Sequence, residues 1–138
     1  MTRYLGVDFG ERAIGLAIGD DDQRLAVALE TVRRISDGQA VDAVLGVAAR
    51  EGAGGLVVGE PRRLDGTVGD AARRAQGFAA KLASASRLPV ALHDEALTTR
   101  EAHARLREAG ARRRHRAAAV HALAAQILLQ DWLDGRQP

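Results

Sequence analysis

The chain contains no cysteine, few aromatic residues and no long apolar run. Without cysteine it can build neither a disulfide framework nor a metal site made of thiolates. No apolar stretch approaches the ~20 residues that a membrane-spanning helix needs, so we expect no membrane partner. The acidic Asp8 comes too early for a secretory signal peptide, and we therefore expect a cytoplasmic protein.

Length and composition suit one globular domain. The chain has 138 residues, of which 46% are hydrophobic. A chain of this size can bury roughly two thirds of the surface that it exposes when unfolded. It shows no internal repeat, low-complexity segment or linker. We expect a single domain over residues 1–138.

The total charge says little about partners. Twenty basic residues stand against 18 acidic ones, which gives a net charge of only +2. Arginine supplies 19 of the 20 basic residues. Arginine is the better bidentate partner for phosphate, but a codon bias would produce the same excess. Local clusters of arginine are therefore better evidence than the total.

The hydrophobic pattern predicts an α/β fold. Strands are predicted over 3–9, 13–19, 25–32, 55–59 and 89–93, and helices over 39–51, 70–85, 99–109 and 116–134. The first three strands follow one another through short turns, whereas the later strands alternate with helices. Such alternation predicts right-handed crossovers and a parallel portion of the sheet. We expect a mixed five-stranded sheet with helices on both faces.

Asp8 is an acidic residue inside the first predicted strand. Strand alternation places it on the face opposite to the apolar side chains of Leu5, Val7 and Phe9. A carboxylate within a strand is costly unless a partner satisfies it. Asp8 either accepts a hydrogen bond from a turn N–H beside Gly10, or it is a metal ligand in a site where glycines leave room for substrate.

A second acidic pair, Asp94 and Glu95, follows the strand predicted over 89–93. Sites tend to assemble at the carboxyl ends of parallel strands and in the loops after them. Asp94 suits the start of a turn. Thr98 and Glu101 match a capping box, so the next helix does not need Glu95 as its cap. A functional role is therefore better assigned to Glu95.

His121 lies within an alanine-rich helix. Gln126 and Gln130 mark the polar stripe of this helix, and His121 is about 140° away from Gln126 at about 100° per residue. Two interpretations stay open. His121 is a core histidine satisfied by a backbone carbonyl, or it belongs to a site that the helix reaches because its alanines allow a close approach to the sheet.

Four segments of the chain resemble the motif blocks of a known family. They are GVDFGERAIGLAIGD (6–20), VVGEPRRLDGTVG (57–69), HDEALTTREA (93–102) and VHALAAQILLQDWL (120–133). In this order they are similar to the four blocks of the YqgF/RuvX family of Holliday junction resolvases and pre-ribosomal RNA nucleases. The resemblance covers nearly the whole chain and implies an RNase H-like fold, in agreement with the predicted element order.

The resemblance also implies a catalytic site. The family's acids are an Asp in the first strand, the Glu of the DE pair and an Asp that opens the last helix. By position these fall on Asp8, Glu95 and residue 121, which in this chain is His121. The implied activity is hydrolysis of phosphodiester bonds by a nuclease that uses Mg²⁺ or Mn²⁺.

The histidine changes the chemistry expected at residue 121. Mg²⁺ prefers oxygen ligands, whereas imidazole suits Mn²⁺ better, so His121 as a ligand would favour Mn²⁺. His121 could instead transfer a proton near neutral pH. A third reading is a nucleic-acid-binding relative that is catalytically weakened because it lost one acid.

Glu60 is a second departure from the family pattern, which commonly has an apolar residue between the Gly and the Pro of this block. It is either a solvated loop carboxylate or an additional metal ligand that restores the negative charge lost at residue 121.

Two arginine clusters flank the candidate site residues in the sequence. They comprise Arg62 and Arg63, and Arg112, Arg113, Arg114 and Arg116. Guanidinium groups there would bind phosphates without reading bases; a solvated charge run is the alternative.

Aromatic residues make up only 3% of the chain, which argues against stacking on unpaired bases. We expect structured nucleic acid as the partner, either four-way junction DNA or a ribosomal RNA precursor, and a two-fold symmetric junction would suit a homodimer.

Overall fold

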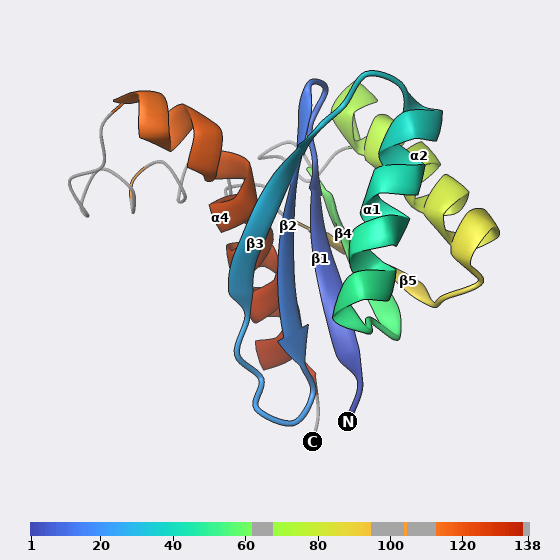
Figure 1. The fold of residues 1–138 in the computed structure, drawn as a ribbon, viewed down its shortest axis with the longest axis vertical. Coiled ribbons are helices and arrows are strands. Elements are labelled where there is room, and N and C mark those ends of the chain that lie inside the picture. Colours follow the sequence, from blue (N-terminus) through green and yellow to red (C-terminus); the bar gives the residue numbers. More distant parts are fainter. Residues whose placement is uncertain (62–67, 95–103, 105–112, 137–138) are drawn as a thin grey trace.

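The structure is a computed structural model that describes residues 1–61, 68–94, 104 and 113–136. In this part of the chain a five-stranded sheet has the order β3-β2-β1-β4-β5 (Figure 1). The strands are β1 (Arg3–Phe9), β2 (Ala13–Asp20), β3 (Val27–Arg33), β4 (Gly55–Glu60) and β5 (Val90–Asp94). β1 is the central strand.

The pairing confirms the predicted mixed sheet. β1 pairs antiparallel with β2, and β2 pairs antiparallel with β3. β4 pairs in parallel with both β1 and β5. Because β1, β4 and β5 run in the same direction, their carboxyl ends meet at one edge of the sheet.

Helices cover both faces of the sheet, as predicted (Figure 1). α1 (Asp37–Glu51) and α2 (Asp70–Ser86) pack on one face, and α4 (Arg113–Asp134) packs on the other. The helix predicted over 99–109 lies outside the described residues except for Ala104. Among the described residues, no helix is long and apolar enough to cross a bilayer.

α1 begins two residues before its predicted start because of a capping box. Ser36 accepts a hydrogen bond from the backbone of Gln39, and the Gln39 side chain accepts one from the backbone of Ser36. The helix ends at Gly52, whose φ of 68° is left-handed and therefore favours glycine.

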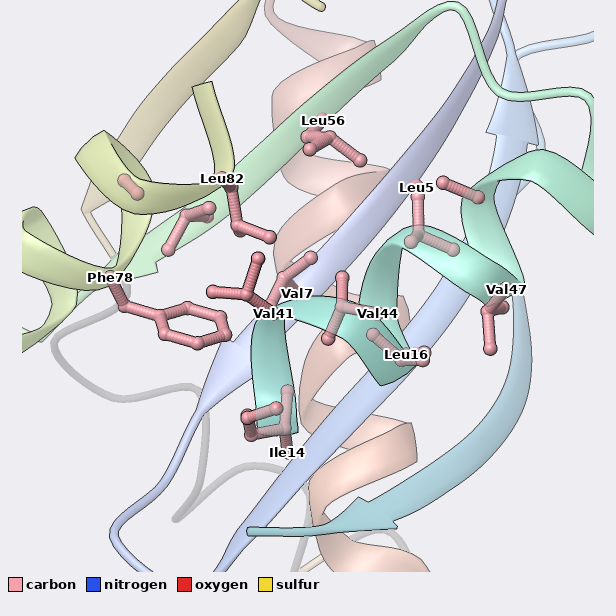
Figure 2. Packing of buried hydrophobic residues seen from close by; sticks show 14 of the residues in the cluster. Leu5, Val7, Ile14, Leu16, Val41, Val44, Val47, Leu56, Phe78 and Leu82 are labelled. Atoms are coloured by element: carbon pink, nitrogen blue, oxygen red, sulfur yellow. The ribbon is translucent and has the colours of Figure 1, made fainter. Parts of the chain in front are cut away.

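The face toward α1 and α2 carries the larger apolar side chains (Figure 2). Leu5 and Val7 of β1 point into this layer, as the alternation along the strand predicts. Val44 of α1 and Phe78 and Leu82 of α2 close it, and all three are fully buried. This layer anchors β1 from the side opposite to Asp8.

The face toward α4 is different because several strand positions there are glycines and have no side chain. A Cβ built on Gly6 would lie 2.8 Å from the Cβ of Leu129. A Cβ built on Gly15 would lie 1.8 Å from the carbonyl oxygen of His121. The close approach of α4 therefore depends on glycines in β1 and β2 as well as on the predicted alanines of the helix.

The polar stripe of α4 fixes the rotation of the helix. Gln130 accepts a hydrogen bond from the N–H of Ala26 at 2.9 Å and donates one to the carbonyl of Arg24 at 2.8 Å. Gln126 donates to the carbonyl of Ala26 at 3.1 Å. These glutamines bind the backbone just before β3, so the face of α4 that carries His121 is turned toward β1.

Replacing Gly15 by alanine should destabilise the protein by about 1–3 kcal/mol, because the added methyl group overlaps the backbone of α4. Gly46→Ala is the matched control: Gly46 lies on the exposed side of α1, and a Cβ there meets nothing within 4 Å. The control should gain about 0.5–1 kcal/mol from helix propensity. Urea unfolding measures the free energy of unfolding of both variants. Equal changes in Gly15→Ala and Gly46→Ala would contradict the close packing of α4 on β2.

Candidate active site

Asp8 lies near the carboxyl end of β1, on the face covered by α4. Its residue is only 4% exposed, so its carboxylate is taken out of bulk water. Its register partner on β2 is Gly15, which leaves the space beside the carboxylate free of a side chain. A buried carboxylate needs a hydrogen-bond partner from the protein.

His121 provides that partner from α4. The distance between its Nδ1 and Oδ2 of Asp8 is 3.1 Å. Its side chain is 30% exposed, so the ring bridges the buried carboxylate and the surface. A Cβ on Gly10 would lie 3.1 Å from Cε1 of His121, which shows that the glycine at the end of β1 makes room for the ring. The structure thus brings together two residues that are far apart in the sequence.

The contact with Asp8 indicates which ring nitrogen of His121 carries the proton. A carboxylate can only accept, so the hydrogen between the two groups belongs to Nδ1 of His121. In the neutral ring, Nε2 then keeps its lone pair. A carboxylate that holds a histidine in this way orients the ring and makes Nε2 a better ligand. Nε2 is therefore the atom that can meet an ion or a substrate.

Glu95 lies outside the described residues, but the strand that leads to it is described. β5 ends at the exposed Asp94, which is the register partner of Glu60. β5 is parallel to β4, and β4 is parallel to β1. β5 therefore ends at the same edge of the sheet where β1 places Asp8.

Glu60 lies on the other face of the sheet. Val58, two residues earlier on β4, packs in the core beneath α1 and α2. Glu60 is 5% exposed, and Gln76 of α2 donates to its Oε2 at 2.9 Å. The interpretation of Glu60 as a solvated loop carboxylate is wrong, because α2 covers it. Its partner on α2 also places it away from the contact between Asp8 and His121.

The predicted arginine clusters are only partly described. Arg62, Arg63 and Arg112 lie outside the described residues. Arg113, Arg114 and Arg116 form the first turn of α4, which begins three residues before its predicted start, and only their helical backbone is described. The same helix carries His121 further along, so this cluster is built into an element of the site.

The described part of the site offers two donor groups to divalent cations. Among the described residues, no group of three or more His, Asp or Glu side chains converges as a metal site. Asp8 offers a carboxylate oxygen and His121 an imidazole nitrogen. A mixed oxygen and nitrogen set suits Mn²⁺ better than Mg²⁺.

A family model described as "RuvX: Holliday junction resolvase" matches residues 2–135 of the chain. The chain belongs to the RuvX family. It is 44% identical over 136 residues to the "Putative pre-16S rRNA nuclease" of Anaeromyxobacter sp. (strain K), and the match covers 99% of both chains. It is 40% identical over 136 residues to a protein of the same name from Mycobacterium ulcerans (strain Agy99), covering 98% of this chain and 80% of the relative.

A solved structure shares the RuvX fold. RuvC of Thermus thermophilus in complex with a Holliday junction substrate superposes with a TM-score of 0.57 and 19% identity, over 96% of this chain and 94% of that one. At this identity the likeness shows the fold alone, and it confirms the predicted RNase H-like architecture. Membership of the RuvX family confirms the predicted class of enzyme, a nuclease that hydrolyses phosphodiester bonds.

The contact between Asp8 and His121 should appear as a coupling energy in a double-mutant cycle without added metal. The Asp8→Ala and His121→Ala variants and their double variant should give a coupling of about 1–3 kcal/mol in urea unfolding, because the carboxylate is buried. The pair of His93 on β5 and Asp131 on α4 is the control. Asp131 is 71% exposed, so this coupling should be smaller. Absence of coupling between Asp8 and His121 would show that the two residues do not interact.

The variant Glu60→Gln should leave metal-dependent cleavage unchanged, because Glu60 faces α2 while Asp8 faces α4. The amide can keep a hydrogen bond with Gln76, so the fold should persist. Initial cleavage rates with Mg²⁺ and with Mn²⁺ test this expectation. A lower cleavage rate of Glu60→Gln with either ion would show that Glu60 takes part in the active site.

Proposed function

We propose that the protein is a divalent-metal-dependent endonuclease that cleaves structured nucleic acid through Asp8, Glu95 and His121. The observation that carries this proposal is the 3.1 Å contact between the buried Asp8 and the half-buried His121 at the carboxyl edge of the parallel strands. Membership of a nuclease family makes phosphodiester hydrolysis the chemistry to expect at such a pair.

The substrate that we propose is a ribosomal RNA precursor, processed at its 5′ end in the cytoplasm. The names of relatives 44% and 40% identical to the chain support this choice. Four-way junction DNA is the second candidate, supported by the description of the family model. Asp8 and His121 can contact a phosphate and its ions, but they do not read bases, so they serve either substrate.

The residues present fit a divalent cation. The contact with His121 uses Oδ2 of Asp8, which leaves Oδ1 for an ion, and Glu95 would add a second carboxylate. When bound, two divalent ions position and polarise the scissile phosphate and the attacking water. Burial of Asp8 strengthens its attraction for a cation, because water screens less there.

We assign Nε2 of His121 to the cation site and Nδ1 to Asp8. In metal sites, a histidine ligand commonly donates its second ring N–H to a carboxylate, which fixes the tautomer and the direction of the free nitrogen. Nδ1 and Oδ2 have this relation here. The exposed part of the ring lets Nε2 meet the substrate side of the site.

Asp8→Asn should lower cleavage at least about 100-fold, because the amide removes the buried negative charge that holds the cation. A 16S rRNA precursor with its 5′ extension and a four-way DNA junction are compared side by side, with Mg²⁺ and with Mn²⁺. Circular dichroism and urea unfolding verify that the variant is folded. If the wild-type protein binds these substrates and cleaves neither with either ion, it is the weakened binding relative instead.

His121→Asp should raise Mg²⁺-supported cleavage above that of the wild type, because it restores an oxygen ligand and a negative charge. His121→Asn is the matched control, because asparagine has nearly the same shape as aspartate but no charge. This control should not raise the rate of Mg²⁺-supported cleavage. Cleavage lost under both ions in His121→Asp would show that the imidazole transfers a proton rather than binding the ion.

A further inference from the structure

A groove of about 760 Å³ runs between β3 and α4, next to the candidate active site. We call it the β3–α4 groove. Its lining includes Arg12, Ala13, Ala28, Arg33, Ala119 and Ala122. Its volume falls within the roughly 300–1,000 Å³ that is usual for ligand sites.

The β3–α4 groove adjoins the site through the β1–β2 turn. Ala13 lines the groove, and its carbonyl oxygen would lie 2.4 Å from a Cβ on Gly10. The same Cβ would lie 3.1 Å from the ring of His121. Ala122, the next residue of α4, lines the groove directly. β1 and β3 are separated by two strand spacings, or roughly 10 Å. About three nucleotides of a stacked strand span this distance, so one strand can reach from the site into the groove.

The charges of the groove suit a polyanion. Arg12 and Arg33 are exposed, and within the described residues no ion pair engages either guanidinium. Arg34, by contrast, is paired with Asp37. The carboxylate of Glu30, which also belongs to the lining, is bound by Arg50 of α1. The net charge that the groove presents is therefore positive.

The backbone that carries Arg12 is held in place. Arg34 donates from its Nη1 to the carbonyl of Glu11 at 3.2 Å and from its backbone N–H to the carbonyl of Arg12 at 2.9 Å. Arg33, on the neighbouring strand, is the register partner of Ala13. Arg12, in the turn before β2, and Arg33, at the end of β3, therefore project from a fixed backbone, and less ordering is required when they bind a ligand.

The rest of the lining explains which part of a polynucleotide fits. The alanines form a smooth apolar floor, and no described residue of the lining is aromatic. Bases would find no ring on which to stack, whereas phosphates would find guanidinium groups. Contacts of this kind position a strand without reading its sequence.

We infer that the β3–α4 groove binds the strand that leads away from the scissile bond, with Arg12 and Arg33 on its phosphates. The inference rests on the proposed nuclease function and names its substrate-binding surface. Arg12 and Arg33 act in binding, and neither takes part in the chemical step.

The test measures binding of a fluorescein-labelled 20-nucleotide oligouridine by anisotropy over a range of NaCl concentrations, in EDTA so that no cleavage occurs. Arg12→Gln and Arg33→Gln should each weaken binding and make the slope of log K against log [salt] shallower by about 0.7, because each removes one phosphate contact. Arg74→Gln is the matched control: Arg74 is an exposed arginine of α2, on the opposite face of the sheet. If Arg12→Gln and Arg33→Gln change the affinity and the salt slope no more than Arg74→Gln does, the inference is wrong.

A second variant changes the shape of the groove and not its charge. Ala119→Leu, on the half-buried side of α4, should weaken binding of the oligouridine while the salt slope stays that of the wild type. Leucine is a good helix former, so α4 should persist. If Ala119→Leu leaves binding unchanged and instead alters the oligomeric state in sedimentation, the groove is an interface between two copies, and the inference is wrong.

The two proposals fail in different ways. Normal cleavage together with groove variants that bind like the wild type would overturn the groove and leave the nuclease function standing. Binding that depends on Arg12 and Arg33, in a protein that cleaves neither substrate with either ion, would support the groove as a polynucleotide site and overturn the nuclease function.

Discussion

The close contact between α4 and the β1–β2 hairpin is the constraint on which the site depends. Gly6 and Gly15 have no side chains at the points where the helix crosses β1 and β2. Any larger residue would push α4 away, and the ring of His121 would then leave the carboxylate of Asp8. The glycines therefore contribute to the chemistry indirectly, because they set the distance between a strand and a helix that are joined only through packing.

The contact with His121 offsets the free-energy cost of burying the Asp8 carboxylate. A buried carboxylate needs a hydrogen-bond donor, and Nδ1 of His121 is that donor. Nε2 of the ring is left for a ligand. The glutamines of α4 hold the helix by the backbone before β3, so the ring cannot rotate away by turning the helix. An aspartate at residue 121 would put two carboxylates together, which requires a bound cation or proton. The histidine gives Asp8 a hydrogen-bond donor in the folded protein before any cation binds.

Local patterns predicted on which face Asp8 and His121 lie, but not the contact between them. Alternation along β1 was enough to put Asp8 on the face opposite to Leu5, and the helical angle was enough to separate His121 from Gln126. The contact between them depends on Gly15, which is far from His121 in the sequence, so no local window contains it. Glu60 was misjudged as solvated for the same reason: its hydrogen-bond partner Gln76 lies on the next helix, outside any local window around Glu60.

In both proposals α4 joins chemistry and binding, since one flank carries His121 and another lines the β3–α4 groove. The central claim is that Nε2 of His121 binds a divalent cation while Asp8 holds the ring through Nδ1. Pulsed electron paramagnetic resonance of Mn²⁺ added to the protein tests this most directly, because it detects a nitrogen bound to the ion. We predict a ¹⁴N coupling that is present in the wild type and absent in His121→Asp. Bound Mn²⁺ with no ¹⁴N coupling in the wild type would contradict the account.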